Sequence, residues 1–221
     1  MSVSRTPTST EDFPIVFLHG FLGTKEDWNE VSSFLDAPCI AVDLPGHGSA
    51  PFSEKLILPD LPKFHLVGYS MGGRLALAIA NEHPEKIASL TLLSTFTGSP
   101  PSNRLAMDQL WAQKILHSFD DFLKSWYDQP LFAGYIPDLS MRKRQNPMSL
   151  AKALLYYSPA KMPVLPTNNA FFVVGERDQK YRALYPNAVV IPNAGHAVHL
   201  EQPEAVAKVI KERVYGLDPS R

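Results

Sequence analysis

The hydrophobic positions along the chain form six short apolar runs that are bounded by turn residues. These runs cover residues 15–18, 39–42, 64–67, 87–93, 171–174 and 188–191. Most are continuous rather than alternating, which is typical of strands buried on both faces of a parallel sheet. Helical patterns lie between them, at 28–35, 71–82 and 203–214. Because strand and helix alternate, the pattern predicts an α/β protein with right-handed crossovers.

One long segment, at about 97–166, interrupts this alternation. It has mostly helical periodicity and contains Trp111, Trp126 and the basic run Arg142-Lys143-Arg144. We expect a helical insertion between two strands that acts as a cap over the site. The chain has 221 residues, no internal repeat and no convincing linker, so we expect a single domain over 1–221 that includes this cap.

The strongest chemical motif is Gly68-Tyr69-Ser70-Met71-Gly72, which follows an apolar run and precedes an Ala/Leu-rich helix. A sharp strand-to-helix turn of this G-x-S-x-G type holds the serine at the carboxyl edge of a sheet. Glycines flank the serine because the backbone packs too closely there for side chains. We therefore predict that Ser70 is catalytic.

A serine hydroxyl needs an imidazole to take its proton, and the imidazole needs a carboxylate to orient it. Of the seven histidines, His196 is preferred because it follows the last apolar run and precedes the final helix. Asp178, which closely follows the run at 171–174, is the preferred carboxylate partner of His196. Glu176 and Asp128 are the competing carboxylates, and Glu176 is expected to turn outward near Arg177. The remaining histidines are expected to be structural; they are His19, His47, His65, His83, His117 and His199.

An oxyanion hole completes the predicted site. Leu18-His19-Gly20-Phe21 follows the first apolar run, and the backbone N–H groups of Phe21 and Met71 are the candidate donors. The order Ser70, Asp178, His196 is that of the α/β-hydrolase fold. We therefore expect this fold, with a mostly parallel sheet, helices on both faces and a helical cap.

Composition excludes several classes of function. The net charge of −1 offers no field that would favour nucleic acid or an anionic membrane as a partner. No apolar run approaches the length of a membrane span, and residues 1–12 lack the apolar core of a signal peptide. The single cysteine, Cys39, suits a reducing cytoplasm. No Cys/His cluster or phosphate-binding loop is present, so neither a metal nor a cofactor is expected. The oligomeric state is left open.

Longer stretches resemble the MenH family, the 2-succinyl-6-hydroxy-2,4-cyclohexadiene-1-carboxylate synthases, over most of the chain. Motifs shared with the wider superfamily are the H-G at 19–20, P-G-H-G at 45–48 and the serine motif. Narrower ones are Arg74, the cap stretch W-Y-x-Q-P at 126–130 and G-E-R-D-x-K at 175–180.

The resemblance implies a lyase rather than a hydrolase. Its substrate would be a cyclohexene that carries ring, succinyl and enolpyruvyl carboxylates, and the reaction would release pyruvate. In this interpretation Ser70, activated by His196 and Asp178, removes a ring proton as a base. The oxyanion hole would stabilise the negative charge that develops on an oxygen.

The resemblance also implies a set of substrate-binding residues, namely Arg74, Tyr69, Arg104, Trp126, Tyr127 and Arg144. Arginine is the preferred carboxylate ligand because its guanidinium can donate two parallel hydrogen bonds. The alternatives are a solvated helix face for the run at 142–144, a surface position for Arg104 and a core position for Trp126. Arg74 lies one helical turn after Ser70, in an otherwise apolar helix.

Two departures from the family pattern are visible. Only residues 49–62, with three prolines, are available for the crossover before the serine motif, so its helix must be shortened or lost. This would expose part of one sheet face or leave it for a partner. The short polar N-terminal stretch suggests that the usual first antiparallel strands are missing. Two other functions stay open: a carboxylesterase or thioesterase with the same triad, and a non-catalytic binding protein.

Overall fold

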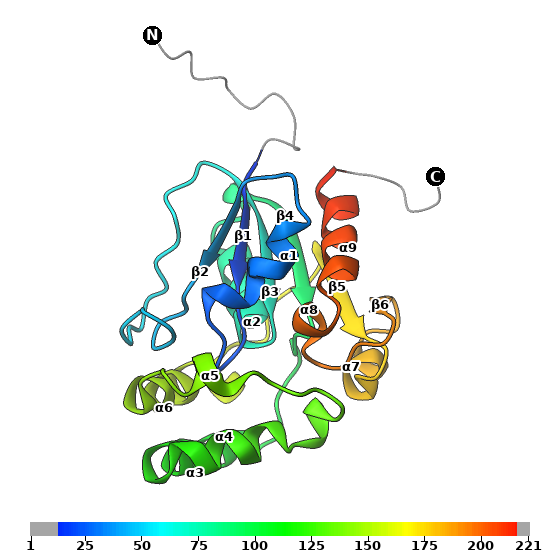
Figure 1. The fold of residues 1–221 in the computed structure, drawn as a ribbon. Coiled ribbons are helices and arrows are strands. Elements are labelled where there is room, and N and C mark those ends of the chain that lie inside the picture. The colour runs from blue at the N-terminus through cyan, green and yellow to red at the C-terminus, as the bar shows by residue number, and fades with distance from the viewer. Residues whose placement is uncertain (1–12, 216–221) are drawn as a thin grey trace.

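A six-stranded parallel sheet forms the centre of the computed structural model, which describes residues 13–215 (Figure 1). The strand order is β2-β1-β3-β4-β5-β6, and every neighbouring pair is parallel. The strands are β1 (Ile15–Leu18), β2 (Cys39–Val42), β3 (Phe64–Tyr69), β4 (Ile87–Leu93), β5 (Ala170–Gly175) and β6 (Val189–Ile191). Each predicted apolar run is thus a strand, and the described sheet contains no antiparallel pair. The polar start at 1–12, with its expected lack of a signal peptide, lies outside the described residues.

Helices cover both faces of the sheet because alternate strand residues point to opposite sides. Ile15 and Phe17 of β1 pack in one core cluster with residues of α8 and α9, whereas Val16 and Leu18 pack in a second cluster with residues of α2. The helices on the sheet are η2 (Lys25–Trp28), α1 (Asn29–Ser33), α2 (Met71–Glu82), η3 (Pro84–Lys86), α7 (Gln179–Leu184), α8 (Val198–Glu201) and α9 (Pro203–Tyr215).

A helical layer inserted between β4 and β5 lies below the sheet in Figure 1. Its elements are α3 (Arg104–His117), α4 (Phe119–Tyr127), η4 (Pro130–Phe132), α5 (Leu139–Arg142), α6 (Pro147–Tyr156) and η5 (Pro159–Lys161). Residues of α3, α4 and α6 form a third core cluster, which also contains Leu22 from the loop after β1. The insertion matches the expected helical cap. The expectation that the cap and the sheet form a single domain stays a prediction.

The crossover between β2 and β3 contains no helix, as its prolines and short length predict. The segment nevertheless packs against the sheet. Phe52, Leu56, Leu58 and Leu61 pack against the cluster on the α2 face. A hollow of about 550 Å³ remains between this segment and α2, and no residue of the predicted triad lines it. The sheet face is therefore covered by an extended segment, with a gap where a helix would fill the space.

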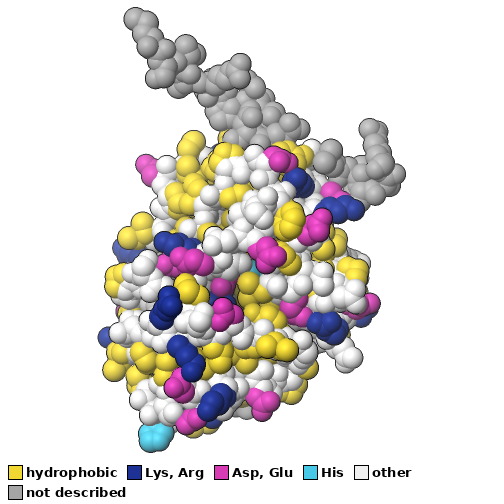
Figure 2. Space-filling view, in the orientation of Figure 1, with side chains coloured by type: hydrophobic (Ala, Val, Ile, Leu, Met, Phe, Trp, Pro, Cys, Tyr) yellow, Lys and Arg dark blue, Asp and Glu magenta, His cyan; other side chains and the backbone are white. Residues whose placement is uncertain are grey.

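Acidic and basic side chains are interspersed over the face shown in Figure 2, as the balanced composition predicts. Within residues 13–215, none of the helices is long and apolar enough to cross a membrane.

Candidate active site

Ser70 lies at a sharp turn between the end of β3 and the start of α2. Its backbone has φ 51° and ψ −108°, a strained conformation for a residue with a side chain. A Cβ on Gly68 would lie 2.6 Å from the Gly72 carbonyl oxygen, and a Cβ on Gly72 would lie 2.3 Å from the His19 carbonyl oxygen. The two glycines therefore let strand, helix and the loop after β1 meet around Ser70, which is the reason for the G-x-S-x-G pattern.

The three predicted catalytic side chains are in contact. His196 Nε2 lies 3.3 Å from Ser70 Oγ, and His196 Nδ1 lies 2.8 Å from Asp178 Oδ2. Asp178 precedes α7, and its second carboxylate oxygen accepts a hydrogen bond from the Tyr181 N–H at 3.4 Å. The imidazole and the carboxylate are both buried, so little water competes for these contacts.

The contact with Asp178 determines how the imidazole is protonated. A carboxylate can only accept, so Nδ1 carries the hydrogen and donates it to Asp178. Nε2 then presents a lone pair to the Ser70 hydroxyl, the arrangement that lets an imidazole take a serine proton. Tyr181 packs beside the ring of His196 with centroids 4.9 Å apart. The geometry thus supports proton transfer at Ser70 Oγ.

The competing carboxylates lie elsewhere. Glu176 is exposed and accepts a hydrogen bond from the Asn193 N–H, while Arg177 pairs with Glu201. Asp128 is also exposed. Neither Glu176 nor Asp128 contacts His196, so the structure brings together the preferred aspartate and not its alternatives.

The other histidines have structural surroundings. His19 accepts a hydrogen bond from the Leu44 N–H at Nε2 and donates from Nδ1 to the Gly20 carbonyl. Burial lowers the pKa of His19, and it lowers the pKa of His199 far below its usual value. His199 stacks between Trp28 and Tyr69. Both imidazoles are therefore held neutral, and neither reaches Ser70.

The two candidate oxyanion donors flank Ser70. Met71 is the first residue of α2, so its N–H has no carbonyl partner within the helix. Phe21 follows the H-G pair after β1 and lines both hollows that reach Ser70. The donation of these amides to a reacting oxygen stays a prediction.

Two adjoining hollows open at Ser70 and share Phe21, Trp126, Leu131 and His196 as walls. The larger, about 110 Å³, contains Arg74 and Arg104, and we call it the arginine chamber. The smaller, about 50 Å³, contains Tyr127, Tyr135 and Arg142, and we call it the tyrosine chamber.

Arg74 lies on the sheet side of the arginine chamber. One of its nitrogens donates to the Tyr157 carbonyl at 3.3 Å, and its buried Nε has no hydrogen-bond partner. Burial lowers the pKa of this guanidinium to about 10. Among the described residues no carboxylate forms an ion pair with Arg74. A partly buried guanidinium that lacks a counter-ion and keeps an unsatisfied N–H is suited to bind an anion.

Arg104 and its partner lie across the same chamber, on α3. The guanidinium contacts both carboxylate oxygens of Asp108, at 3.0 and 2.8 Å, and Asp108 is fully buried. Arg104 keeps a third of its side-chain surface exposed. This pair fixes the guanidinium at the chamber wall, rather than on a free surface as the alternative interpretation held.

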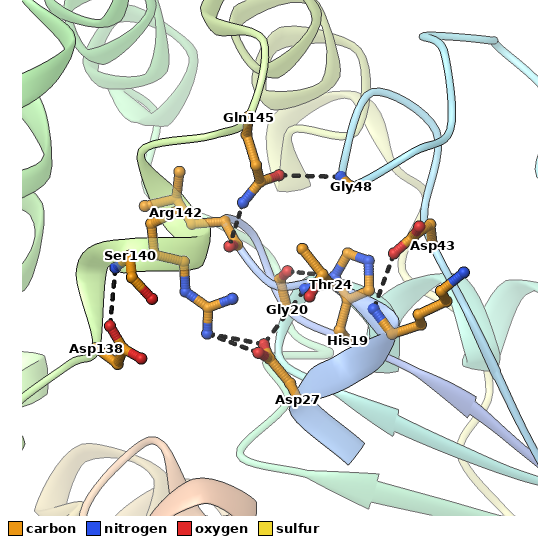
Figure 3. A network of polar contacts seen from close by, with 12 residues as sticks. His19, Gly20, Thr24, Asp27, Asp43, Gly48, Asp138, Ser140, Arg142 and Gln145 are labelled. Carbon is orange, nitrogen blue, oxygen red and sulfur yellow. Dashed lines mark hydrogen bonds and ion pairs between the residues drawn. The ribbon is translucent and has the colours of Figure 1, made fainter. Parts of the chain in front are cut away.

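In the tyrosine chamber the structure places a different arginine from the expected one. Arg144 is exposed and lines neither chamber. Arg142, two residues earlier, is buried and contacts Asp27 at 2.8 and 2.9 Å (Figure 3). Burial by itself lowers the pKa of Arg142, but the charge and hydrogen bond of Asp27 and the nearby Tyr127 and Tyr135 together raise the pKa overall. Arg144 does not line either chamber here because α5 ends at Arg142 and the next two residues are exposed, so a role for Arg144 in substrate binding stays a prediction.

The expected aromatic residues line the chambers. Trp126 is half-buried, forms a wall of both and packs on Phe21 with centroids 5.1 Å apart. Tyr69 and Tyr127 line the tyrosine chamber, and Tyr69 lies 5.4 Å from the His196 ring. Sequence reasoning missed Tyr181, which lines the arginine chamber beside His196; the available signal was its position three residues after Asp178.

Metal-ligating side chains do not cluster in the described part of the chain, where no group of three or more His, Cys, Asp or Glu residues could hold an ion. The chemistry that this site can perform is proton transfer at Ser70 and stabilisation of anionic groups by arginine.

Comparison with known protein families gives a match to the alpha/beta hydrolase family over residues 15–209. A 2-succinyl-6-hydroxy-2,4-cyclohexadiene-1-carboxylate synthase from Enterobacter sp. (strain 638) is 32% identical, with 94% of each chain covered. The enzyme of the same name from Escherichia coli O1:K1 / APEC is 34% identical over 87% of this chain and 90% of its own.

Among solved structures, MenH from S. aureus aligns with a TM-score of 0.75 and 26% identity, covering 94% of this chain and 96% of its own. A thermophilic esterase from Thermogutta terrifontis has the same fold, with a TM-score of 0.76 and 22% identity over 92% of this chain and 90% of its own. The chain therefore belongs to the α/β-hydrolase family and, within it, to the family of 2-succinyl-6-hydroxy-2,4-cyclohexadiene-1-carboxylate synthases.

Proposed function

We propose that this protein is a lyase of menaquinone biosynthesis. It eliminates pyruvate from 2-succinyl-5-enolpyruvyl-6-hydroxy-3-cyclohexene-1-carboxylate and yields 2-succinyl-6-hydroxy-2,4-cyclohexadiene-1-carboxylate. The observation that carries the proposal is the partly buried guanidinium of Arg74, which lines the chamber that opens at Ser70, has a buried Nε without a hydrogen-bond partner and forms no ion pair with a described carboxylate. The names of the relatives at 32% and 34% identity support the same reaction.

Ser70 acts as the base in this reaction. Its oxygen takes a proton from a ring carbon while its own proton passes to His196 Nε2, which lies 3.3 Å away. The electron pair of the broken C2–H bond forms a C2=C3 double bond, the pair of the existing C3=C4 double bond shifts to C4=C5, and the C5–O bond to the enolpyruvyl group breaks. The departing enolate takes the proton from the imidazolium and becomes pyruvate, so no oxidant or reductant is needed.

Negative charge develops on a substrate oxygen as the ring proton leaves. We assign its stabilisation to the N–H groups of Phe21 and Met71, and the assignment is supported by both residues lining the arginine chamber together with Ser70. Donors that are already oriented stabilise the transition state without further reorganisation, and such a donor contributes about 3 to 4 kcal/mol in other enzymes. Asp178 stabilises the imidazolium during this step.

The arginines bind the three carboxylates of the substrate. Arg74 takes one of them, since it lacks an ion-pair partner among the described residues. Arg142 keeps Nε and Nη1 unpaired although it contacts Asp27, so it can hold a second carboxylate from the tyrosine chamber. Arg104 contributes from the outer wall of the arginine chamber, where its contact with Asp108 orients it. Tyr69, Trp126 and Tyr127 shape the walls around the ring.

We place the reaction in the cytoplasm, where the single, partly buried thiol of Cys39 would stay reduced. The partner is a small polycarboxylate, and the proposal requires neither nucleic acid nor a membrane.

The decisive experiment supplies the purified protein with the tricarboxylate and, separately, with a p-nitrophenyl ester. We expect release of pyruvate from the first at a rate far above release of p-nitrophenol from the second. The reverse preference would identify an esterase that uses the same triad. Catalysis of neither reaction would leave a binding protein.

The arginine assignment has its own test. Arg74→Gln should reduce kcat/KM for the tricarboxylate by about 100-fold, because a charge-assisted bidentate contact is worth about 1.5 to 3 kcal/mol. Arg182→Gln is the matched control, since this arginine is exposed and lines neither chamber. Equal kcat/KM values for Arg74→Gln and the unmodified protein would remove the carboxylate-binding role.

A further inference from the structure

The backbone turn that carries the Phe21 amide is strained. The Gly23 N–H donates to the Gly20 carbonyl at 2.9 Å, and this bond closes a turn with Phe21 and Leu22 in its centre. Leu22, the third residue of the turn, has φ 65°. A turn of this kind requires positive φ at its third position, where glycine is the usual residue. A leucine adopts this conformation only when its surroundings hold it there.

The turn controls where the Phe21 N–H points. The Gly20 carbonyl and the Phe21 N–H are the two ends of one planar, trans peptide group, so they point in opposite directions. Two contacts hold the Gly20 oxygen: the turn bond from Gly23 and the hydrogen bond from His19 Nδ1 at 2.8 Å. If Leu22 relaxed to negative φ, the turn bond would be lost and the orientation of the Phe21 amide would no longer be fixed by it.

The contacts that hold Leu22 come from the cap. The side chain of Leu22 is fully buried in the cap core, with Ile115, Phe122 and Leu150 among its cluster. Its carbonyl oxygen accepts a hydrogen bond from Gln145 Nε2 at 2.7 Å, across 123 positions of sequence. The side chain and the carbonyl group of Leu22 are therefore both held by the cap, which is distant from Leu22 in the sequence.

Gln145 is itself held in place by a second contact. Its Oε1 accepts a hydrogen bond from the Gly48 N–H at 3.2 Å, so the amide bridges two loops that lie at the sheet edge (Figure 3). Only 5% of Gln145 is exposed. Arg142, three residues earlier, contacts Asp27 just after the turn. One short cap segment thus contacts the loop after β1 at two points.

We propose that Gln145 and Leu22 are positioning residues through which the cap holds the turn at residues 20–23, here called the oxyanion turn, in the conformation that catalysis requires. The cap is then more than a cover: its docking sets φ at Leu22, closes the Gly20–Gly23 turn and orients the Phe21 N–H toward the reacting oxygen. The proposal rests on the proposed function insofar as that function uses the Phe21 amide. It adds two residues that touch neither substrate nor the triad.

The test compares variants of Gln145 by steady-state kinetics. Gln145→Leu has nearly the same shape and removes both hydrogen bonds. Gln145→Glu keeps the acceptor for Gly48 and puts an oxygen against the Leu22 carbonyl. We expect kcat for pyruvate release to fall about 10- to 100-fold in both, with KM within threefold, because a misplaced oxyanion donor weakens only the transition state. Gln113→Leu, an exposed substitution on α3, is the control and should leave both constants unchanged.

A second arm tests whether Gln145 acts through Leu22. Glycine adopts positive φ without strain, so in a Leu22→Gly background the turn needs less support. Gln145→Leu should therefore reduce kcat by a smaller factor in that background than in the unmodified protein. Equal factors in both backgrounds, an unchanged kcat, or a loss confined to KM would each overturn the proposal.

A third arm does not depend on the lyase reaction. The crystal structure of Gln145→Leu should show Leu22 away from φ 65° or the Gly20–Phe21 peptide rotated, and an unaltered turn would refute the proposal. If the unmodified protein released no pyruvate, the proposed function would fail, and this structure together with the rate of p-nitrophenyl ester hydrolysis would still decide the role of Gln145.

Discussion

Acid should destabilise this protein through a histidine that is buried beside the oxyanion turn. His47 is 1% exposed, and its ring lies 5.2 Å from that of His19 and 5.4 Å from that of Phe21. Its Nδ1 lies 3.2 Å from the Pro45 carbonyl oxygen, and its buried Nε2 has no hydrogen-bond partner. Burial lowers the pKa of His47 to about 3.

The magnitude follows from the difference between the two states. The ordinary histidine pKa of 6.5 applies to the unfolded chain, so at pH 5 the unfolded chain binds a proton that the folded protein excludes. The stabilising contribution of neutral His47 is complete above pH 6.5 and is lost progressively as the pH falls toward 3. With 1.36 kcal/mol per pKa unit, His47 alone lowers the free energy of unfolding by about 2 kcal/mol between pH 7 and pH 5.

The assay is reversible urea unfolding at pH 7 and pH 5, for the unmodified protein and for His47→Asn. The asparagine amide can replace the Nδ1–H donor toward Pro45 but does not titrate. The variant will be less stable at pH 7, because the ring contacts with Phe21 and His19 are lost. What matters is the change with pH, which should be about 2 kcal/mol smaller in the variant than in the unmodified protein.

An equal loss of unfolding free energy in both proteins between pH 7 and pH 5 would refute this reasoning. It would show that His47 titrates alike in the folded and unfolded states, and therefore that its ring is reached by water or by a counter-charge. His19 and His199 also have lowered pKa values because of burial, so the His47→Asn variant should keep part of the acid sensitivity.

Two further predictions concern the catalytic turn. Ser70→Ala should reduce pyruvate release by several orders of magnitude while the melting temperature stays the same or rises, because the base is lost and no core packing changes; retention of most of the activity would remove Ser70 from the mechanism. Gly68→Ala should lower the free energy of unfolding by about 1 to 3 kcal/mol, since the new Cβ would lie 2.6 Å from backbone atoms of α2. Gly98→Ala is its control, because the nearest atom there is 3.4 Å away, and urea unfolding of the two variants should separate them clearly.

The sequence by itself determined the strands and the catalytic triad. Each apolar run is a strand because burial on both faces of a parallel sheet requires continuous apolar residues, a property that short windows of sequence display. The elbow around Ser70 could be predicted from its local G-x-S-x-G pattern, in which Gly68 is required by the backbone of the following helix, although Gly72 is required by the distant backbone at Leu18 and His19. Asp178 and His196 could be predicted because the carboxyl ends of parallel strands meet at one edge, so position after a strand implies proximity.

Tertiary structure decided which cap residues reach the site. The basic run 142–144 has the same charge at each position, so the sequence does not show which side chain lines a chamber. Arg142 does so because α5 ends there and because its guanidinium contacts the carboxylate of Asp27, 115 positions away. Gln145 and Leu22 gave no signal in the sequence, because a strained turn and the amide that supports it are 123 positions apart. Contacts of this kind depend on how the cap packs on the sheet edge, and local periodicity carries no information about that packing.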